Sequence, residues 1–385
     1  MMSNPDAGNF ESSILASEYG VAKSVLSNLA CKDLMKSSLV CQLWRDVAKY
    51  LFMKRSCIHW DFHFELKRKY AAIEIGNFLD NFSCNIVSRP KLCVCITNAR
   101  DIVGKTKEET LRTTKKDTKW TAISTSLPCS DFLILSAPGM IGTSVDGKIH
   151  ELEDKAGFTI LSFPDIPNVA MSSFTLNRTQ INNGIKLMNS RGDLLNLVGL
   201  DQNLGLPQNS KPKALLLFST SQLYSFVGTF AEKFSSTFEE TVAIGGGFVD
   251  LSLTLPGPMF GPVTGIVFSG DGVEAASVVI TSQEHGGVEE KMKELKAVGL
   301  SEDKSICFMF ACVGRGYHMF GRENFESQMF KIYFPQTPLF GFFGHGEIGT
   351  DCIPKVSDSN EKRLKISREF VHGYCTILVF LSFKK

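Results

Sequence analysis

Two stretches that end in glycine loops, CFMFACVGRG (307–316) and PLFGFFGHGEIG (338–349), decide the fold of the C-terminal part of this chain. Each begins with an apolar run of strand length, which predicts a strand buried on both faces. Residues 324–333, between the two runs, have helical apolar spacing. The sequence therefore predicts a strand–helix–strand unit with a glycine loop at the end of each strand.

A similar unit lies a little over ninety residues earlier. Residues 214–220 form an apolar run, LYSFVGTFAEKF (223–234) follows with helical spacing, and residues 241–244 run into three glycines at 245–247. Two related units at a fixed offset indicate an internal duplication. The turn residues SGDG (269–272) predict an antiparallel hairpin between the flanking apolar runs.

The middle of the chain is also rich in strand signals. Apolar runs at 92–97, 132–136 and 158–163 are separated by glycine and proline, which predicts short strands and turns. The basic stretch 105–119 is interpreted as a solvated loop, with a nuclear-import patch as the sharper alternative. Residues 201–212 have the composition of a linker. The fold class expected is α+β, with mostly antiparallel sheets.

The first sixty residues follow a different, helical pattern. Ala22, Val25, Leu26 and Leu29 recur at the spacing of one helix face, and a second face begins at Val40. The apolar residues of this second face are Val40, Leu43, Trp44, Val47 and Leu51. So short a helical segment cannot bury all of this surface alone, so it must pack on the rest of the chain or on a partner.

Composition and charge exclude several classes of protein. The 41 basic and 40 acidic residues leave a formal net charge of +1, which argues against electrostatic binding to nucleic acid or to an anionic membrane. The N-terminus lacks the apolar segment of a signal peptide, and no apolar run has the length of a membrane helix. The eleven cysteines include no CxxC pair, so free thiols in a reducing compartment are expected, without a metal site.

The helical segment VLSNLACKDLMKSSLVCQLWRDV (25–47) resembles an F-box. The residues that match the F-box pattern, and that the resemblance implies for adaptor binding, are Val25, Leu26, Leu29, Leu34, Val40, Cys41 and Trp44. The usual Leu-Pro pair is replaced by Ser17-Glu18-Tyr19, and Ala30 stands where many members have proline. The two C-terminal glycine stretches, with AIGGGF (243–248) and SAPGMIG (136–142), look like elements of the FIST domain. The domains expected are an F-box (13–60), a FIST N-terminal domain (84–200) and a FIST C-terminal domain (212–385).

This resemblance implies a three-helix F-box followed by an α+β body of two FIST halves. F-box proteins are non-catalytic substrate receptors that bind a Skp adaptor, and through it a cullin and a RING subunit, to recruit protein substrates for ubiquitination. The chain is accordingly expected in the cytoplasm and in the nucleus, with no cofactor. The alternative is an intracellular FIST protein that senses a small ligand and uses its helical end as a scaffold contact.

Several residues of the glycine loops are candidates for chemistry. Arg315, His345 and Glu347 are predicted to line a recognition surface or a pocket for a small anion, against the alternative of a glycine turn with a solvated arginine. Cys312 is a candidate for a reactive thiol at its rim. Residues 344–349 match GxGxxG, but Pro354 argues against the helix that a dinucleotide site requires. His59 and His63 lack the acid of a zinc-protease motif, and no nucleophile motif is present, so no enzyme is predicted.

Overall fold

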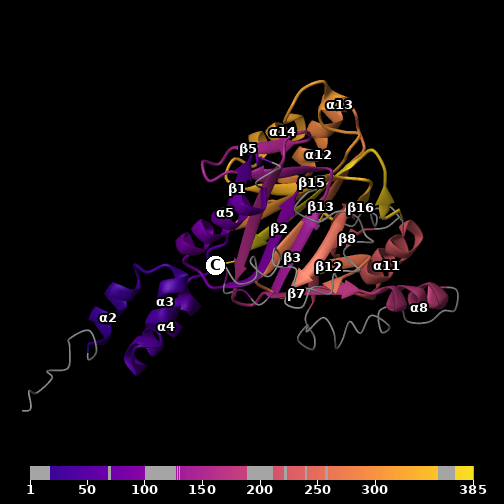
Figure 1. The fold of residues 1–385 in the computed structure, drawn as a ribbon. Coiled ribbons are helices and arrows are strands. Elements are labelled where there is room, and N and C mark those ends of the chain that lie inside the picture. Colours follow the sequence, from indigo (N-terminus) through magenta and orange to yellow (C-terminus); the bar gives the residue numbers. More distant parts are fainter. Residues whose placement is uncertain are drawn as a thin grey trace, which may run out of the picture.

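The protein is described by a computed structural model (Figure 1). The described residues are 18–67, 71–99, 127, 129, 131–188, 211–220, 223–238, 241–255, 259–353 and 369–384. The predicted loop at 105–119 and nearly all of the predicted linker at 201–212 lie outside them.

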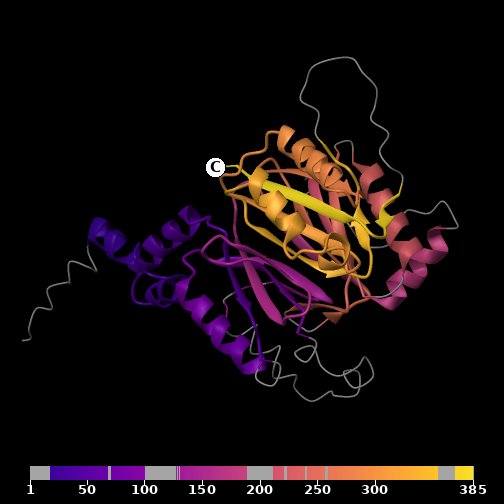
Figure 2. The ribbon, with the colours of Figure 1, turned by 90° about the horizontal axis from the view of Figure 1, so that it is seen from above.

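The described part of the N-terminal module, residues 18–55, contains three short helices, in agreement with the prediction. They are α2 (Tyr19–Leu26), α3 (Cys31–Ser37) and α4 (Gln42–Lys54). Their apolar faces meet in a small core of Ala22, Leu26, Leu34, Val47, Ala48 and Leu51. The module projects from one side of the body in both ribbon views (Figures 1 and 2).

Strands of the described residues form three six-stranded sheets. The first sheet has the order β1 (His59–Phe64), β6 (Gly157–Pro164), β2 (Pro90–Thr97), β3 (Asp131–Ser136), β10 (Leu251–Leu255) and β11 (Met259–Phe260). The second has the order β17 (Val371–His372), β16 (Glu347–Gly349), β9 (Ala243–Phe248), β8 (Pro212–Ser219), β12 (Val263–Ser269) and β7 (Ala170–Leu176). The third has the order β13 (Val273–Ile280), β18 (Thr376–Phe383), β14 (Ser305–Cys312), β15 (Leu339–Gly344), β4 (Gly139–Thr143) and β5 (Ile149–Leu152). Most neighbouring strands are antiparallel, so the α+β prediction is confirmed.

Each sheet is built around one parallel pair: β2 with β3, β8 with β9, and β14 with β15. Antiparallel strands flank every pair, and the outer strands come from other parts of the chain. Two of these pairs, β8 with β9 and β14 with β15, belong to the two related units found in the sequence, and the parallel arrangement of their strands recurs in β2 with β3. Each of the three sheets contains strands from before and from after the predicted linker at 201–212. The predicted domain boundaries stay a prediction.

The three sheets share one core, and helices cover their outer faces. In β14, Phe308 and Phe310 point into the shared core, whereas Cys307 and Met309 pack on the helices. This alternation is the side-chain period of a strand. The helices that pack against the sheets are α5 (Ala71–Asn85), α8 (Arg178–Met188), α11 (Tyr224–Thr237), α12 (His285–Ala297), α13 (Tyr317–Phe320) and α14 (Phe325–Tyr333).

The hairpin predicted at 269–272 is wrong. The turn does join two strands, but β12 belongs to the second sheet and β13 to the third. Each strand instead pairs with partners distant in sequence, because the turn is where the chain crosses from one sheet to the next. Local turn residues cannot distinguish this crossing from a hairpin.

Two glycines mark equivalent positions in two of the parallel pairs. A Cβ on Gly341 would lie 1.7 Å from the carbonyl oxygen of Met309, and one on Gly246 would lie 1.8 Å from that of Leu217. Gly341 is paired with Met309, and Gly246 with Leu217, in their respective registers. The same close backbone approach is thus repeated in two units, as the internal duplication predicts.

Replacing Gly341 with alanine is expected to lower the free energy of unfolding by more than about 2 kcal/mol, because the new methyl group overlaps a backbone oxygen. The matched control is Gly286→Ala at the start of α12, where no atom lies within 4 Å of an added Cβ. That variant should be as stable as the wild type or slightly more so. Urea unfolding followed by circular dichroism measures both, and equal stabilities would contradict the close-approach argument.

Candidate functional site

The two predicted glycine loops lie side by side. Cys312 ends β14, Arg315 lies in the following loop, and Glu347 begins β16. The backbone N–H of Val313 donates to the carbonyl oxygen of Gly344 at 3.0 Å. The structure therefore brings the two loops together at one end of the second and third sheets.

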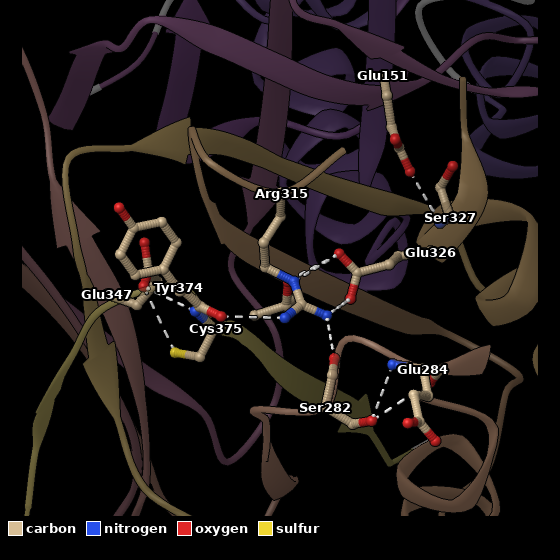
Figure 3. A network of polar contacts seen from close by, with 10 residues as sticks. Glu151, Ser282, Glu284, Arg315, Glu326, Ser327, Glu347, Tyr374 and Cys375 are labelled. Carbon is tan, nitrogen blue, oxygen red and sulfur yellow. Dashed lines mark hydrogen bonds and ion pairs between the residues drawn. The ribbon is translucent and has the colours of Figure 1, made fainter. Parts of the chain in front are cut away.

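Arg315 is fully buried and forms an ion pair with Glu326 of α14 (Figure 3). Its Nε donates to Glu326 Oε2 at 3.1 Å, and its Nη2 donates to Oε1 at 2.8 Å. Nη1 and Nη2 also donate to the carbonyl oxygens of Tyr374, at 3.1 Å, and Ser282, at 3.0 Å. The solvated-arginine alternative is therefore wrong. The guanidinium holds three segments together and is not presented to solvent.

Glu347 is also buried, close to two cysteines. Its Oε2 accepts from the backbone N–H of Cys375 at 3.3 Å and lies 3.5 Å from that residue's Sγ. The Cys312 thiol also hydrogen bonds this carboxyl group. Burial raises the Glu347 pKa to about 8, against which these hydrogen bonds and nearby Arg315 act to lower it. Its Oε1 has no hydrogen-bond partner among the described residues.

The two thiols are poor nucleophiles in this environment. Burial and the Glu347 carboxyl raise the pKa of both Cys312 and Cys375 above that of an ordinary cysteine. A reactive thiol requires a lowered pKa. The arrangement therefore supplies a protonated acid beside two protonated thiols at neutral pH, which argues against cysteine catalysis.

His345 is separated from this buried group by its orientation. Its side chain is half exposed, and Nε2 lies 3.0 Å from Asp250 Oδ1 in the turn between β9 and β10. Of the four predicted site residues, Cys312, Arg315 and Glu347 thus come together inside the protein, whereas His345 lies on the surface. The role of the four residues in ligand or substrate binding stays a prediction.

The remaining motifs lie in strands. The GxGxxG match begins at the end of β15 with Gly344 and ends in β16 with Gly349, so the segment does not open the helix that a dinucleotide site needs. His59 and His63 lie in β1, where His59 Nε2 accepts from the backbone N–H groups of Val87 and Ser88, both at 3.4 Å. The ring of His63 packs on Phe78. In the part of the chain that the structure describes, no group of metal-binding side chains and no helix capable of crossing a membrane is present.

The residues predicted to bind an adaptor divide into two groups. Leu26 and Leu34 are buried in the core of the module, and Leu29 and Trp44 pack partly against that core. Val25 and Val40 are exposed, and Cys41 is half buried. The sequence analysis missed other apolar residues of the module that the structure leaves exposed: Tyr19, Val21, Leu39 and Met53.

Comparison with known proteins finds similarity to the FIST C domain and to F-box proteins. The sequence model of the FIST C domain family matches residues 260–350. Along nearly its whole length the chain is similar to F-box only protein 22 from Homo sapiens, with 26% identity over 398 residues, 96% of this chain and 93% of that protein. The same protein from Pongo abelii is 26% identical over 395 residues, again 96% of this chain and 93% of the relative. The resemblance that the sequence analysis stated is confirmed.

Two further similarities are more limited. An F-box/LRR-repeat protein from Arabidopsis thaliana is 36% identical over 76 residues, which cover 19% of this chain and 14% of that protein. Among solved structures, the cyanuric acid hydrolase from A. caulinodans aligns with 86% of this chain and 100% of its own, at 8% identity and a TM-score of 0.33.

Replacing Arg315 with alanine is expected to lower the free energy of unfolding by about 3–5 kcal/mol, because Glu326 would be left as an unpaired buried charge. The matched control is Arg322→Ala. Arg322 is exposed and stacks on Phe325, so its loss should change stability by less than about 1 kcal/mol. Thermal and urea unfolding measure the difference. An equally small effect of both changes would contradict the role of the buried pair.

Glu347 should make stability fall as the pH rises. Because its folded-state pKa of about 8 lies above the ordinary 4.5, folding binds a proton, and the stabilisation present below pH 4.5 is lost as the pH rises through 8. Glu347→Gln cannot ionise at this position. Its free energy of unfolding should therefore rise relative to that of the wild type, by up to a few kcal/mol, as the pH increases from 5 to 9. The control is Glu274→Gln on the surface, which should show the wild-type slope. Parallel curves for wild type and Glu347→Gln would disprove the assignment.

Proposed function

We propose that this protein is the substrate-recognition subunit of a Skp–cullin–F-box ubiquitin ligase. The observation that carries the proposal is the exposed apolar surface of the N-terminal module. Of the 14 exposed large apolar side chains among the described residues, six belong to this module: Tyr19, Val21, Val25, Leu39, Val40 and Met53. Exposed apolar residues gathered on a small element indicate a protein interface. The similarity to F-box only protein 22 supports a Skp adaptor as the partner.

The module is held firmly to the body, as a receptor of this kind requires. The Arg55 guanidinium donates to the carbonyl oxygens of Ser27 at 2.8 Å and Leu29 at 2.9 Å in the module. It also donates to that of Val87 in the body at 3.0 Å. The backbone N–H of Cys31 in α3 donates to the carbonyl oxygen of Ile86, which follows α5, at 2.8 Å. One arginine thus joins the end of α2 to the body.

In this proposal the receptor acts by proximity and performs no chemistry of its own. Docking through the module places a substrate on the body close to the ubiquitin-charged enzyme that the cullin and RING subunit recruit, which raises the effective concentration of substrate lysines. The ubiquitinated substrate is then degraded by the proteasome. We place this activity in the cytoplasm and the nucleus. No cofactor, nucleic acid or membrane takes part.

One observation favours a second function, the sensing of a small ligand by the body. Glu347 Oε1 is buried without a hydrogen-bond partner among the described residues, and such a group is costly unless something satisfies it. A ligand with a hydrogen-bonding group would do so. In that case the N-terminal module would be a scaffold contact, and the two functions differ in whether the module binds a Skp adaptor.

Leu39→Glu combined with Val40→Glu is expected to abolish co-purification with a Skp adaptor, because two charges would enter the apolar interface. Both side chains are exposed, at 78% and 66%, so the module should fold normally. This pair is a cleaner test than Trp44, which packs against the module core. The matched control is Ile332→Glu on α14 of the body, where isoleucine is 73% exposed. Retained adaptor binding in a folded double variant would refute the proposal.

A further inference from the structure

The joint between the N-terminal module and the body is built around one side chain, Arg55, which directly follows α4. In the module, its guanidinium donates to the carbonyl oxygens of Leu26 at 3.4 Å, Ser27 at 2.8 Å and Leu29 at 2.9 Å. In the body, it donates to the carbonyl oxygen of Val87 at 3.0 Å. Four acceptors from two separate segments of the chain thus converge on one planar group.

The chemistry of these acceptors calls for arginine. Carbonyl groups at the C-terminal end of an α-helix lack partners within the helix, and the helix dipole favours a positive charge there. Because α2 ends at Leu26, Arg55 supplies both the donors and the charge. A guanidinium presents several N–H groups in one plane, whereas a lysine ammonium is a single point charge. Lysine would keep the charge of Arg55 and lose the fork.

The fork of Arg55 fixes the helix that carries half of the exposed apolar surface of the module. Three of the six exposed apolar residues of the module belong to α2: Tyr19, Val21 and Val25. The buried residues of this helix, Ala22 and Leu26, pack in the core of the module itself. The bond from Arg55 to Val87 therefore ties α2, and with it the proposed adaptor surface, to the body.

The other two helices of the module reach the body by contacts of their own. Cys31 of α3 and Phe52 of α4 pack in the apolar cluster between α5 and the first sheet. After α4, the backbone N–H of Cys57 donates to Ser88 Oγ at 3.1 Å. Without Arg55 the module would keep these contacts and lose the one that fixes α2, so it would tilt about α3.

We propose that Arg55 is a positioning residue, which sets the angle of the adaptor-binding module on the body and thereby selects the lysines that receive ubiquitin. This inference rests on the proposed function, because the angle matters to ubiquitin transfer only if the module docks on an adaptor. A rigid joint holds the body at one angle to the charged enzyme, which gives a few lysines a high effective concentration. A loose joint spreads the transfer over more lysines. Arg55 acts through the joint and needs no contact with adaptor, substrate or ubiquitin.

Hydrogen exchange of the full chain tests the joint without any partner. The backbone N–H of Cys31, which donates to the carbonyl oxygen of Ile86 in the body, reports opening of the joint. In Arg55→Gln and in Arg55→Lys it should exchange at least about tenfold faster, because charged hydrogen bonds that hold the joint are lost. The amides of α4 should keep their wild-type rates, since the module stays folded. The control is Arg45→Gln, where the arginine bonds Gln42 on its own helix. Unchanged exchange at Cys31 in both Arg55 variants would overturn the proposal.

A reconstituted ligase tests the selection of lysines. The full chain is combined with a purified Skp adaptor, cullin, RING subunit, ubiquitin-conjugating enzyme and ubiquitin. The lysines of the receptor itself serve as acceptors and are mapped by mass spectrometry. Wild type and Arg45→Gln should modify the same few lysines, whereas Arg55→Gln, which adds no lysine, should modify more of them.

Co-purification with the adaptor should be equal in all three proteins, which separates a change of angle from loss of docking. Identical lysine patterns in Arg55→Gln and wild type would overturn the selecting role of Arg55. Failure of the wild type to bind the adaptor would instead refute the ubiquitin-ligase function. Faster exchange at Cys31 in the Arg55 variants would then leave the hold of Arg55 on the module standing.

Discussion

The body of this protein depends on a core that three sheets share. Each sheet turns one face toward this core, so every central strand must carry large apolar residues at alternate positions. Phenylalanine meets this demand: Phe218, Phe310 and Phe342 pack ring against ring where the second and third sheets meet. The 30 phenylalanines of the chain are in this sense a consequence of the architecture.

An edge strand of the first sheet attaches the N-terminal module to the body. Strand β1 pairs with β6 at the edge of the first sheet, just as β7 pairs with β12 and β13 with β18 in the other two. The chain therefore leaves the three helices through a strand that completes the body. The module is joined to the sheets by backbone hydrogen bonds as well as by the Arg55 contacts.

The sequence predicts which segments of this protein form strands better than it predicts which strands pair with one another. The runs that became β2, β3, β6, β8 and β14 are recognisable because alternating or continuous apolar patterns report burial directly. The third parallel pair was missed, because neither β2 nor β3 carries the glycines that mark β9 and β15. The prediction of a hairpin at 269–272 was wrong, because turn residues show only that the chain reverses direction. The sheet that each flanking strand joins depends on residues distant in sequence.

The candidate site shows the same limit more sharply. That Cys312, Arg315 and Glu347 converge was predictable from loops at the ends of adjacent strands. That Arg315 would be buried was not, because its partners are Glu326 on a later helix and the carbonyl oxygens of Ser282 and Tyr374. An arginine flanked by glycines carries no sign of a carboxylate eleven residues away.

The order of the strands in the third sheet has a consequence for synthesis on the ribosome. The third sheet places β18 (Thr376–Phe383) between β13 and β14, and its far edge comes from β4 and β5. While β18 is still in the exit tunnel, β13 and β14 lack the strand that lies between them. Unpaired apolar strands of this kind promote aggregation. A nascent chain without β18 should consequently be a strong client for chaperones, and the body should fold only after β18 has left the tunnel.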